Sequence, residues 1–312
     1  MLKILTITLN PCIDKSIAVN GLYADRKLHC KLHSFEPGGG GINVSRAIQN
    51  LGGTSECWFL QGGYHGLFFL QLIRHKLRYK SFAISNETRE NIIVHDESSG
   101  AQYLFDISGP IVTEGEWEPI LTALQHSEGT DLVVASGSLP PGVPTDFYAR
   151  LARIAKSKGI KLIVDTAGEP LAHALQEGLY LCKPNLKEFC ALTGAQPDNL
   201  EDVQLKAQSL IQSGSCEAVV ISLGPEGALL VQQQFAAHIP APAVQKKSTV
   251  GAGDSMLAGI VYQLSIGSDL RKAVAYGVAS GAAATVSAGT ALCTKANTEH
   301  FFAIVQQNFP IK

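Results

Sequence analysis

Short apolar runs alternate along the chain with segments in which apolar residues recur at helical spacing. The runs are rich in β-branched residues, and several are almost continuously apolar: Ile4–Leu9, Cys57–Leu60, Leu132–Ala135, Lys161–Asp165, Tyr180–Lys183 and Ala218–Leu223. Such runs are typical of strands that are covered on both faces. Between them, the i, i+3, i+4, i+7 spacing of one helix face occurs at Val44, Ala47, Ile48 and Leu51, and again at Leu257, Ile260, Val261 and Leu264. The alternation predicts an α/β fold in which a parallel sheet is sandwiched between helices.

Two stretches interrupt this alternation with extended segments and no helical pattern. They are residues 15–36 and 88–107, and their extended pieces are Ser16–Val19, Leu28–Phe35, Asn91–His95 and Gln102–Asp106. We expect these pieces to form a separate small sheet that projects from the main layer. The sequence has no internal repeat, low-complexity tract or linker, so residues 1–312 are expected to form a single domain.

Composition and charge narrow the range of partners. Charged residues make up 17% of the chain, and the net charge of −2 gives no electrostatic reason to expect nucleic acid or an anionic membrane as a partner. The seven cysteines contain no C-x-x-C pair, as expected for reduced thiols. Met1–Asn10 alternates like a strand rather than a signal peptide, and the uncharged stretch Ala273–Thr294 consists mostly of small residues, which favours a packed helix over a membrane span. A cytoplasmic protein is predicted.

The tract Ser248–Ser255 carries the strongest chemical signal. Gly251, Ala252 and Gly253 leave their N–H groups uncovered at the start of a predicted helix, and such a helix start binds anions. Asp254, in the first turn, would then lie beside the anion and within reach of an incoming hydroxyl group. Taken alone, the tract could equally be a glycine-rich helix start in which Asp254 only interacts with the helix dipole.

A second signal is the run of four glycines at Gly38–Gly41, followed by Asn43. Glycines allow the backbone to approach a ligand closely, and the amide of Asn43 offers both a donor and an acceptor. A flexible loop before a helix is the alternative for this tract alone. The sequence contains no G-x-x-x-x-G-K-[ST] motif and no G-x-G-x-x-G after a strand, so any nucleotide must bind by another route.

Two further tracts follow apolar strands. In Lys183–Glu188, Asn185 and Glu188 are three positions apart at a predicted helix start, and a carboxylate with an amide suits hydrated Mg²⁺. The alternative is an ordinary helix start after Pro184. In Ser222–Gly227, a glycine-containing turn leaves its strand and could either approach a nucleotide or form a simple hairpin.

These tracts occur together in a fixed order, as G-G-G-I-N, K-P-N-x-x-E and T-V-G-A-G-D. In this combination the chain resembles the ribokinase/PfkB family of carbohydrate kinases, and the likeness runs from Leu5 to Thr294. Within the family it is most similar to the bacterial type II 6-phosphofructokinases, on the tracts Phe35–Asn43, Gly137–Gly142 and Gly289–Cys293. Gly40 stands where the related 1-phosphofructokinases and tagatose-6-phosphate kinases usually carry lysine.

The resemblance implies a ribokinase-like fold with a small β lid over the sugar site, and a homodimer in which the lids pair. Asp14 resembles the aspartate that accepts hydrogen bonds from sugar hydroxyls. The sugar would also be held by Gly39, Gly40, Gly41 and Asn43, with Ser138 nearby. Lys27 and Arg89 are the cationic candidates for a sugar phosphate, because ammonium and guanidinium donors suit a dianion.

The nucleotide side follows from the same resemblance. Lys183 and Asn185 would face the phosphates of ATP, and Glu188 would face Mg²⁺. The nucleotide would be bordered by Ser222, Gly224, Pro225, Glu226 and Gly227, and the anion hole would be formed by Gly251, Ala252 and Gly253. In some relatives a monovalent cation such as K⁺ is held at the positions of Ser248, Val250, Ala284, Ser287 and Gly289.

The activity implied is Mg-ATP-dependent phosphorylation of the C1 hydroxyl of fructose 6-phosphate, as in glycolysis, with Asp254 as the general base. Two alternatives remain open at this stage. One is a kinase of the same branch that acts on tagatose 6-phosphate or fructose 1-phosphate. The other is a non-catalytic sensor of sugar phosphates or nucleotides on the same fold.

Overall fold

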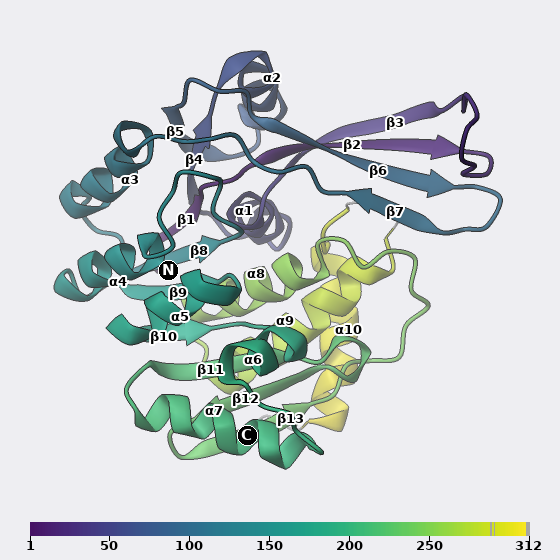
Figure 1. Ribbon diagram of the computed structural model, residues 1–312. Coiled ribbons are helices and arrows are strands. Elements are labelled where there is room, and N and C mark those ends of the chain that lie inside the picture. Colours follow the sequence, from purple (N-terminus) through teal and green to yellow (C-terminus); the bar gives the residue numbers. More distant parts are fainter. Residues whose placement is uncertain (288, 290, 310–312) are drawn as a thin grey trace.

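A nine-stranded sheet forms the centre of the computed structural model, which describes residues 1–287, 289 and 291–309 (Figure 1). Its order is β13-β12-β11-β10-β9-β8-β1-β4-β5. Every neighbouring pair from β5 to β11 is parallel, and only the β11–β12 and β12–β13 pairs are antiparallel. The strand bounds are β1 Ile4–Thr8, β4 Glu56–Gln61, β5 Arg78–Ala83, β8 Leu132–Ser136, β9 Lys161–Asp165, β10 Leu179–Cys182, β11 Cys216–Ser222, β12 Ala228–Gln232 and β13 Phe235–Ile239.

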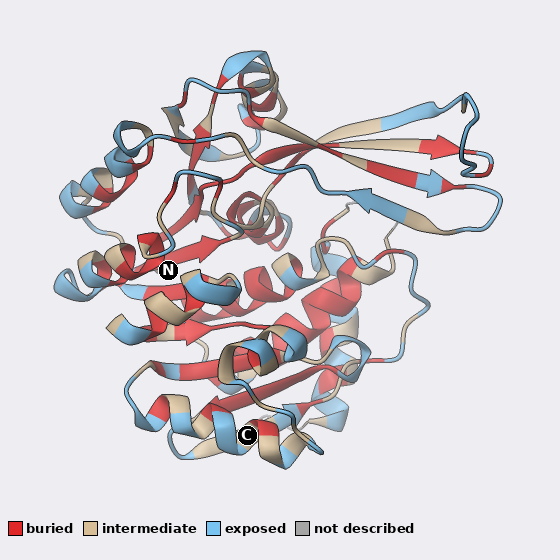
Figure 2. Ribbon diagram, viewed as in Figure 1, coloured by how far each residue is buried: buried red, intermediate tan, exposed pale blue. Residues whose placement is uncertain are grey.

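Helices cover both faces of this sheet, which confirms the predicted α/β sandwich. One face packs against α1 Gly40–Asn50, α8 Ala252–Ser265 and α9 Leu270–Thr285, with α10 Lys295–Asn308 lying on α9. The other face packs against α3 Glu114–His126, α4 Phe147–Ser157, α5 Gly168–Glu177, α6 Leu186–Thr193 and α7 Leu200–Gln212. Strands β1 and β8 are buried along their whole length, whereas α3, α4 and α7 expose their outer faces (Figure 2). This double cover explains why the strands read as continuous apolar runs.

The helix-free stretches form a second sheet in the order β3-β2-β6-β7, which projects from the large layer (Figure 1). Its strands are β2 Cys12–Val19, β3 Lys31–Gly38, β6 Arg89–Asp96 and β7 Gln102–Phe105. Strands β2 and β3 extend beyond the expected range 15–36. Strand β2 begins at Cys12, four residues after β1 ends, and β3 runs on to Gly38 because Pro37 and Gly38 pair with Ile13 and Cys12. Helix α2 Gly63–Ile73 supports this region, since Phe69 and Ile73 pack against Ile13 of β2 and Phe59 of β4.

The uncharged stretch near the C-terminus lies largely in α9, whose residues Ala273–Ala284 are all buried against neighbouring helices and strands. Among the described residues, none of the helices has the length and apolar character that a membrane crossing requires. Small side chains allow α8 and α9 to approach closely: a Cβ added at Gly277 would lie 2.8 Å from the carbonyl oxygen of Met256. The composition of this stretch is therefore explained by helix packing.

Candidate active site

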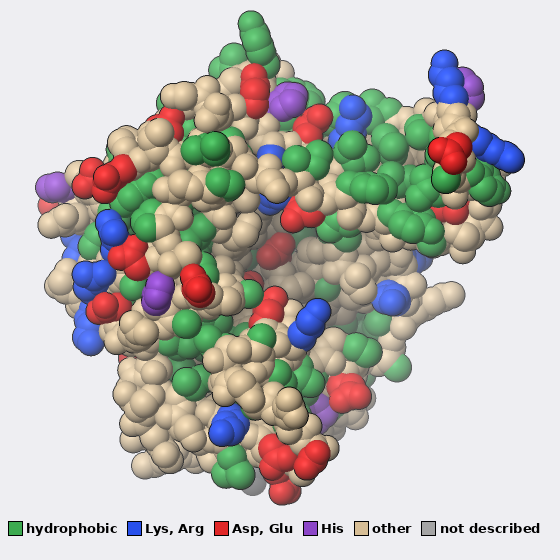
Figure 3. Space-filling model, in the orientation of Figure 1, with side chains coloured by type: hydrophobic (Ala, Val, Ile, Leu, Met, Phe, Trp, Pro, Cys, Tyr) green, Lys and Arg blue, Asp and Glu red, His purple; other side chains and the backbone are tan. Residues whose placement is uncertain are grey.

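Polar residues gather at the carboxyl edge of the large sheet, and Lys183 and Ser222 of the predicted tracts are among them. Ser136 ends β8, Asp165 ends β9, Lys183 follows β10 and Ser222 ends β11, while α1 and α8 begin at the same edge. The carboxyl ends of parallel strands are the usual place for ligand sites in open α/β sheets. Figure 3 shows a hollow in this region, beneath the projecting small sheet, with acidic side chains visible inside it.

Two cavities meet at the start of α8. The first, about 780 Å³, lies under the small sheet and is lined by nine of the predicted site residues: Asp14, Gly39, Gly40, Asn43, Arg89, Ser138, Glu188, Val250 and Asp254. The second, about 670 Å³, has mostly apolar walls and is lined by Ser222, Gly224, Pro225, Gly227, Ala252 and Gly253. The turn Gly251–Asp254 thus lies between a polar cavity and an apolar one, with Asp254 facing the first and Gly253 the second.

Asp254 lies in the first turn of α8, after Gly251 in the left-handed conformation (φ 74°). The N-cap residue is Gly251, which has no side chain to cap this helix start. Burial raises the pKa of Asp254 to about 6, the nearby Asp165 carboxylate adds to the increase, and the hydrogen bond from Asn43 and the charge of Lys183 oppose it. A carboxylate with this pKa is ionised near pH 7 and is basic enough to accept a proton.

Asn43 on α1 binds Asp254 and is itself held by Arg46, one helical turn further on. Asn43 Nδ2 donates to Asp254 Oδ2 at 2.9 Å, and Arg46 Nη1 donates to Asn43 Oδ1 at 3.2 Å. Arg46 also donates to Glu36 Oε2 at 2.7 Å and to the carbonyl oxygen of Pro37 at 2.8 Å. Because Arg46 occupies the amide oxygen, the amide nitrogen of Asn43 is the atom that faces the carboxylate. The i, i+3 spacing on α1 was the sequence signal for Arg46, which sequence reasoning missed.

Lys183 is buried and pairs with Asp165, at 3.3 Å between Nζ and Oδ1. Burial raises the pKa of Asp165, and the charge of Lys183 is the main opposing influence. A Cβ added at Gly253 would lie 3.6 Å from Lys183 Nζ, which places the ammonium group beside the start of α8. Sequence reasoning missed Asp165, an acidic residue at the end of a strand that otherwise reads as apolar.

Asn185 and Glu188 cap the start of α6. Asn185 Oδ1 accepts from the Glu188 N–H at 2.8 Å, and Glu188 Oε2 accepts from the Asn185 N–H at 2.9 Å. This capping box corresponds to the alternative interpretation of the tract as a helix start. Glu188 also lines the polar cavity, whereas Asn185 lines neither cavity.

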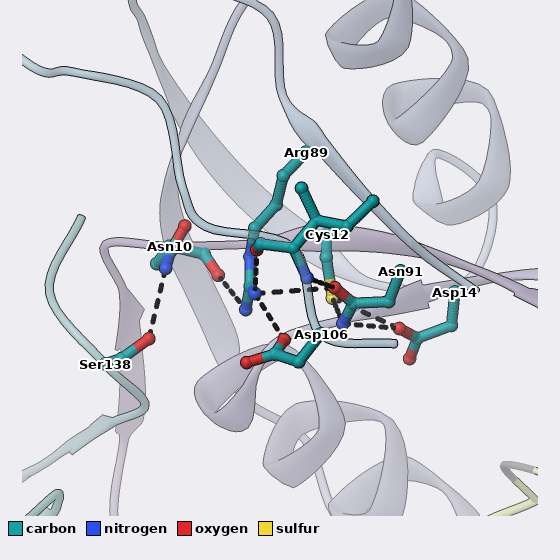
Figure 4. Close-up of polar contacts among 8 residues, drawn as sticks. Asn10, Cys12, Asp14, Arg89, Asn91, Asp106 and Ser138 are labelled. Carbon is teal, nitrogen blue, oxygen red and sulfur yellow. Dashed lines mark hydrogen bonds and ion pairs between the residues drawn. The ribbon is translucent and has the colours of Figure 1, made fainter. Parts of the chain in front are cut away.

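Arg89 begins β6 and is held in a network with Asp106, the residue that follows β7 (Figure 4). The Arg89 side chain is only 10% exposed and lines the cavity, so it is not a surface arginine. Beside it, Asn91 Nδ2 donates to Asp14 Oδ1 at 3.2 Å, and Cys12 Sγ donates to the same oxygen at 3.3 Å. Burial raises the pKa of Asp14, and these two hydrogen bonds oppose the increase.

A family model for the pfkB family carbohydrate kinases matches residues 7–297. The chain belongs to this family. It is 39% identical over 309 residues to the ATP-dependent 6-phosphofructokinase isozyme 2 of Escherichia coli strain K12, covering 98% of this chain and 100% of that protein. It is 32% identical over 282 residues to the 1-phosphofructokinase of Borreliella burgdorferi, covering 90% of this chain and 91% of that protein.

Solved structures of the Escherichia coli phosphofructokinase-2 superpose on this pfkB-family chain over 98% of its length and 100% of theirs. The structure in complex with potassium has a TM-score of 0.95 at 39% identity, and the structure in complex with fructose-6-phosphate has a TM-score of 0.92 at 37% identity. These similarities support the kinase fold that the ordered sequence tracts predicted.

In this pfkB-family chain, the glycine run Gly38–Gly41 packs closely against strands of the large sheet and does not form a free loop. A Cβ added at Gly41 would lie 2.8 Å from the carbonyl oxygen of Ile7 on β1, and one added at Gly40 would lie 2.8 Å from the carbonyl carbon of Ser136 on β8. Gly39, at φ 108°, adopts a backbone conformation that favours glycine. The run therefore brings the start of α1 onto the ends of two strands.

Several predicted site residues line neither cavity of the kinase. Lys27 is exposed in the connection between β2 and β3, and Gly41, Glu226 and Gly251 also lie outside both linings. Of the predicted cation-site residues, only Val250 lines the polar cavity. Ser248 lies beside the end of α9, because its N–H donates to the Thr285 carbonyl oxygen at 3.3 Å, and the Ser287 N–H donates to the Ala284 carbonyl oxygen. Gly289 is described, while its neighbour Thr290 lies outside the described residues.

Proposed function

We propose that this pfkB-family kinase is an ATP-dependent 6-phosphofructokinase, which transfers a phosphoryl group to the C1 hydroxyl of fructose 6-phosphate. The observation that carries the proposal is the position of Asp254, a basic carboxylate at an uncapped helix start between a polar and an apolar cavity. Two curated proteins similar to this chain are named as this enzyme, and a similar solved structure is described in complex with fructose-6-phosphate.

The polar cavity has the groups that a phosphorylated sugar requires. Asp14 and Asn43 can bond sugar hydroxyls, and Gly39, Gly40 and Ser138 form the adjoining wall. Arg89 is the cation for the sugar phosphate. Lys27 does not reach the cavity of its own chain, so a role for it depends on the homodimer described below.

The apolar cavity suits the adenosine part of ATP, since nucleotide sites combine apolar walls with a few polar groups. The N–H groups of Gly251, Ala252 and Gly253 and the ammonium of Lys183 would face the phosphates. Ser222 and Gly224–Gly227 would border the base and ribose.

The donor set fits hydrated Mg²⁺ rather than a metal enclosed by protein. The described residues contain no cluster of three or more His, Cys, Asp or Glu suited to a metal ion, but Mg²⁺ keeps several waters and needs only one or two carboxylates. Glu188, on the cavity wall, would supply one of them. When bound, the ion neutralises charge on the ATP phosphates.

In the proposed reaction, Asp254 accepts the proton of the C1 hydroxyl as that oxygen attacks the γ-phosphoryl group. Asn43 holds the carboxylate in place through its 2.9 Å hydrogen bond. The glycine N–H groups at the start of α8 stabilise the negative charge on the transferred group. The small sheet, which overhangs the polar cavity, would close over the sugar and exclude water.

The small sheet also supports the proposed homodimer. Leu32, Tyr103, Leu104 and Phe105 are all exposed on its strands, and exposed apolar groups of this kind mark association surfaces.

A K⁺ ion near Ser248 and Ala284 is proposed because one similar solved structure is described in complex with potassium. A cytoplasmic location is proposed because the seven cysteines are free, as in a reducing compartment.

The test is a coupled assay of ADP release with fructose 6-phosphate, tagatose 6-phosphate and fructose 1-phosphate. We expect the highest kcat/KM with fructose 6-phosphate. A tenfold higher value with either other sugar would assign the protein to that reaction instead, which is relevant because a 1-phosphofructokinase is among its relatives. Binding without turnover for all three would identify a sensor rather than an enzyme.

A further inference from the structure

We propose that Asp106 is a specificity-determining residue that competes with the sugar phosphate for Arg89 and thereby weakens the binding of phosphorylated sugars. The inference rests on the proposed function, since it concerns the phosphate site of the same cavity. The guanidinium group of Arg89 already has partners within the protein, and Figure 4 shows it in contact with Asp106 and Asn10.

Most of the donors of Arg89 are occupied within the protein. Nη1 donates to Asp106 Oδ1 at 2.5 Å and to the carbonyl oxygen of Ile107 at 2.8 Å, and it lies 3.4 Å from Asn91 Oδ1. Nη2 donates to the carbonyl oxygen of Asn10 at 3.3 Å. Nε has no hydrogen-bond partner among the described residues, but it is buried and therefore closed to a ligand. A phosphate that binds here finds one hydrogen of Nη2 unpaired, while Nη1 is taken by a carboxylate.

The two partners differ in how firmly they are held. The Arg89 side chain is 10% exposed and is fixed by neutral acceptors on two other segments, whereas the Asp106 side chain is 65% exposed. The Ile107 N–H donates to Asn91 Oδ1 at 3.1 Å, which tethers the chain after β7 independently of the Asp106 carboxylate. Asp106 can therefore leave Arg89 by rotating into solvent without a change in the backbone.

A phosphate dianion and the Asp106 carboxylate cannot share the Nη1 donors without bringing like charges together. Binding of the phosphate thus exchanges one anion for another at Arg89. The gain in binding free energy is therefore the difference between the Arg89–phosphate and the Arg89–Asp106 hydrogen bonds, and not the full value of the Arg89–phosphate bond.

On the described part of the cavity wall, no other cation of the same chain compensates. Among the described lining residues, Arg89 is the only basic side chain, and the wall also carries the carboxylates of Asp14, Asp165, Glu188 and Asp254. Lys183, which lies behind the wall, pairs with Asp165. Within one chain, the affinity for the sugar phosphate therefore depends on Arg89, and Asp106 directly controls how much of the charge of Arg89 is available.

The test compares Asp106→Asn with Glu97→Gln as a matched control. The first variant keeps the size of the side chain and a hydrogen-bond acceptor but removes the competing charge. The second removes a carboxylate from the Lys31–Glu97 pair, a 3.8 Å surface pair beside the same small sheet. For Asp106→Asn we expect the KM for fructose 6-phosphate to fall roughly three- to tenfold, because a charge-assisted bond to an exposed partner is partly screened. The KM for ATP should stay within about twofold of wild type.

Inorganic phosphate provides a readout that does not require turnover. Its dissociation constant, measured by calorimetry, should fall by a similar factor in Asp106→Asn and stay unchanged in Glu97→Gln. An unchanged or higher KM together with unchanged or weaker phosphate binding would overturn the inference and show that Asp106 instead holds Arg89 ready for the substrate. If the wild type does not phosphorylate fructose 6-phosphate, the proposed function fails, but the phosphate measurement still decides the role of Asp106.

Discussion

Asn43 on α1 donates a hydrogen bond of 2.9 Å to Asp254 on α8, which is 211 positions further along the chain. The amide keeps this orientation because Arg46 donates to its oxygen. The charged groups that act on Asp254 are Asp165 of β9 and Asp14 of β2, which raise its pKa, and Lys183 after β10, which lowers it. Arg46 and Glu36 act on the carboxylate through Asn43 and do not bind it.

Wild-type kcat should therefore depend on pH with an acid limb near pH 6. The pKa of Asp254 is raised to about 6, so the basic form predominates above that pH and is lost as the pH falls through it. In Arg46→Gln the amide of Asn43 is no longer fixed, and loss of its bond to the carboxylate would raise this pKa. The acid limb should move up by about 0.5–1 pH unit, since one unit corresponds to about 1.4 kcal/mol.

Glu36→Gln is the matched control for Arg46→Gln, because it breaks the 2.7 Å Arg46–Glu36 pair and leaves the Arg46–Asn43 bond in place. Its acid limb should stay near that of the wild type. A loss of stability without an effect on Asp254 would lower kcat at every pH and leave the limb in place, and this result would refute the positioning role of Arg46.

Asp254→Asn tests the general base directly. The change keeps the shape of the side chain and removes the basic oxygen, so kcat should fall about 10²–10⁴-fold, or about 3–5 kcal/mol in the activation barrier. The pKa of Asp254 rises from 3.8 in the unfolded chain to about 6 in the folded protein, so the free energy of unfolding decreases as the pH increases through that interval. The neutral side chain avoids this loss, so the free energy of unfolding at pH 7 should be equal or higher. A variant with more than about a tenth of wild-type kcat would exclude Asp254 as the base.

Arg89→Ala should raise the KM for fructose 6-phosphate far more than the KM for ATP. A charge-assisted contact contributes about 1.5–3 kcal/mol, which is roughly 10- to 100-fold, and the competition from Asp106 favours the lower end. Arg153→Ala removes an exposed arginine of α4 that pairs with Glu177 at the end of α5 and lines neither cavity, so it should change neither KM. Equal effects of Arg89→Ala on both substrates would remove this residue from the sugar site.

Gly40→Ala should destabilise the protein, whereas Gly253→Ala should impair its activity. An added Cβ at Gly40 meets the backbone of Ser136 and Gly137 at 2.8 and 2.9 Å, and overpacking of this kind costs about 1–3 kcal/mol in the free energy of unfolding. At Gly253 the nearest atom is Lys183 Nζ at 3.6 Å, so the fold tolerates the methyl group. That group would nevertheless cover the proposed phosphate site and lower kcat/KM for ATP by at least about tenfold. Urea unfolding and steady-state kinetics on both variants separate the two effects.

The pattern of apolar and polar positions was enough to predict the layers of the fold, and the glycine-containing tracts predicted a candidate site. Strands covered on both faces must be apolar throughout, and a helix that packs on them must repeat its apolar residues every three or four positions, so Leu132–Ala135 and the α8 face from Leu257 to Leu264 could be recognised without a structure. The order of the three glycine- and asparagine-containing tracts indicated the kinase family. The tract at Gly251–Asp254 also lies at a helix start, as its small residues predicted.

Which side chains contact one another became known only from the folded arrangement of the chain. Asp165 meets Lys183 across neighbouring strands, Asp106 meets Arg89 across the small sheet, and Asn43 meets Asp254 between two helices. None of these pairs has a spacing that marks it, because the register of the strands and the packing of the helices set the distances. The same holds for the glycine run Gly38–Gly41. A close approach of its backbone to another group was predictable, but the sequence did not indicate that this group would be the ends of β1 and β8. Local conformation depends on residues a few positions apart, whereas the charge around Asp254 depends on residues that only the folded chain brings together.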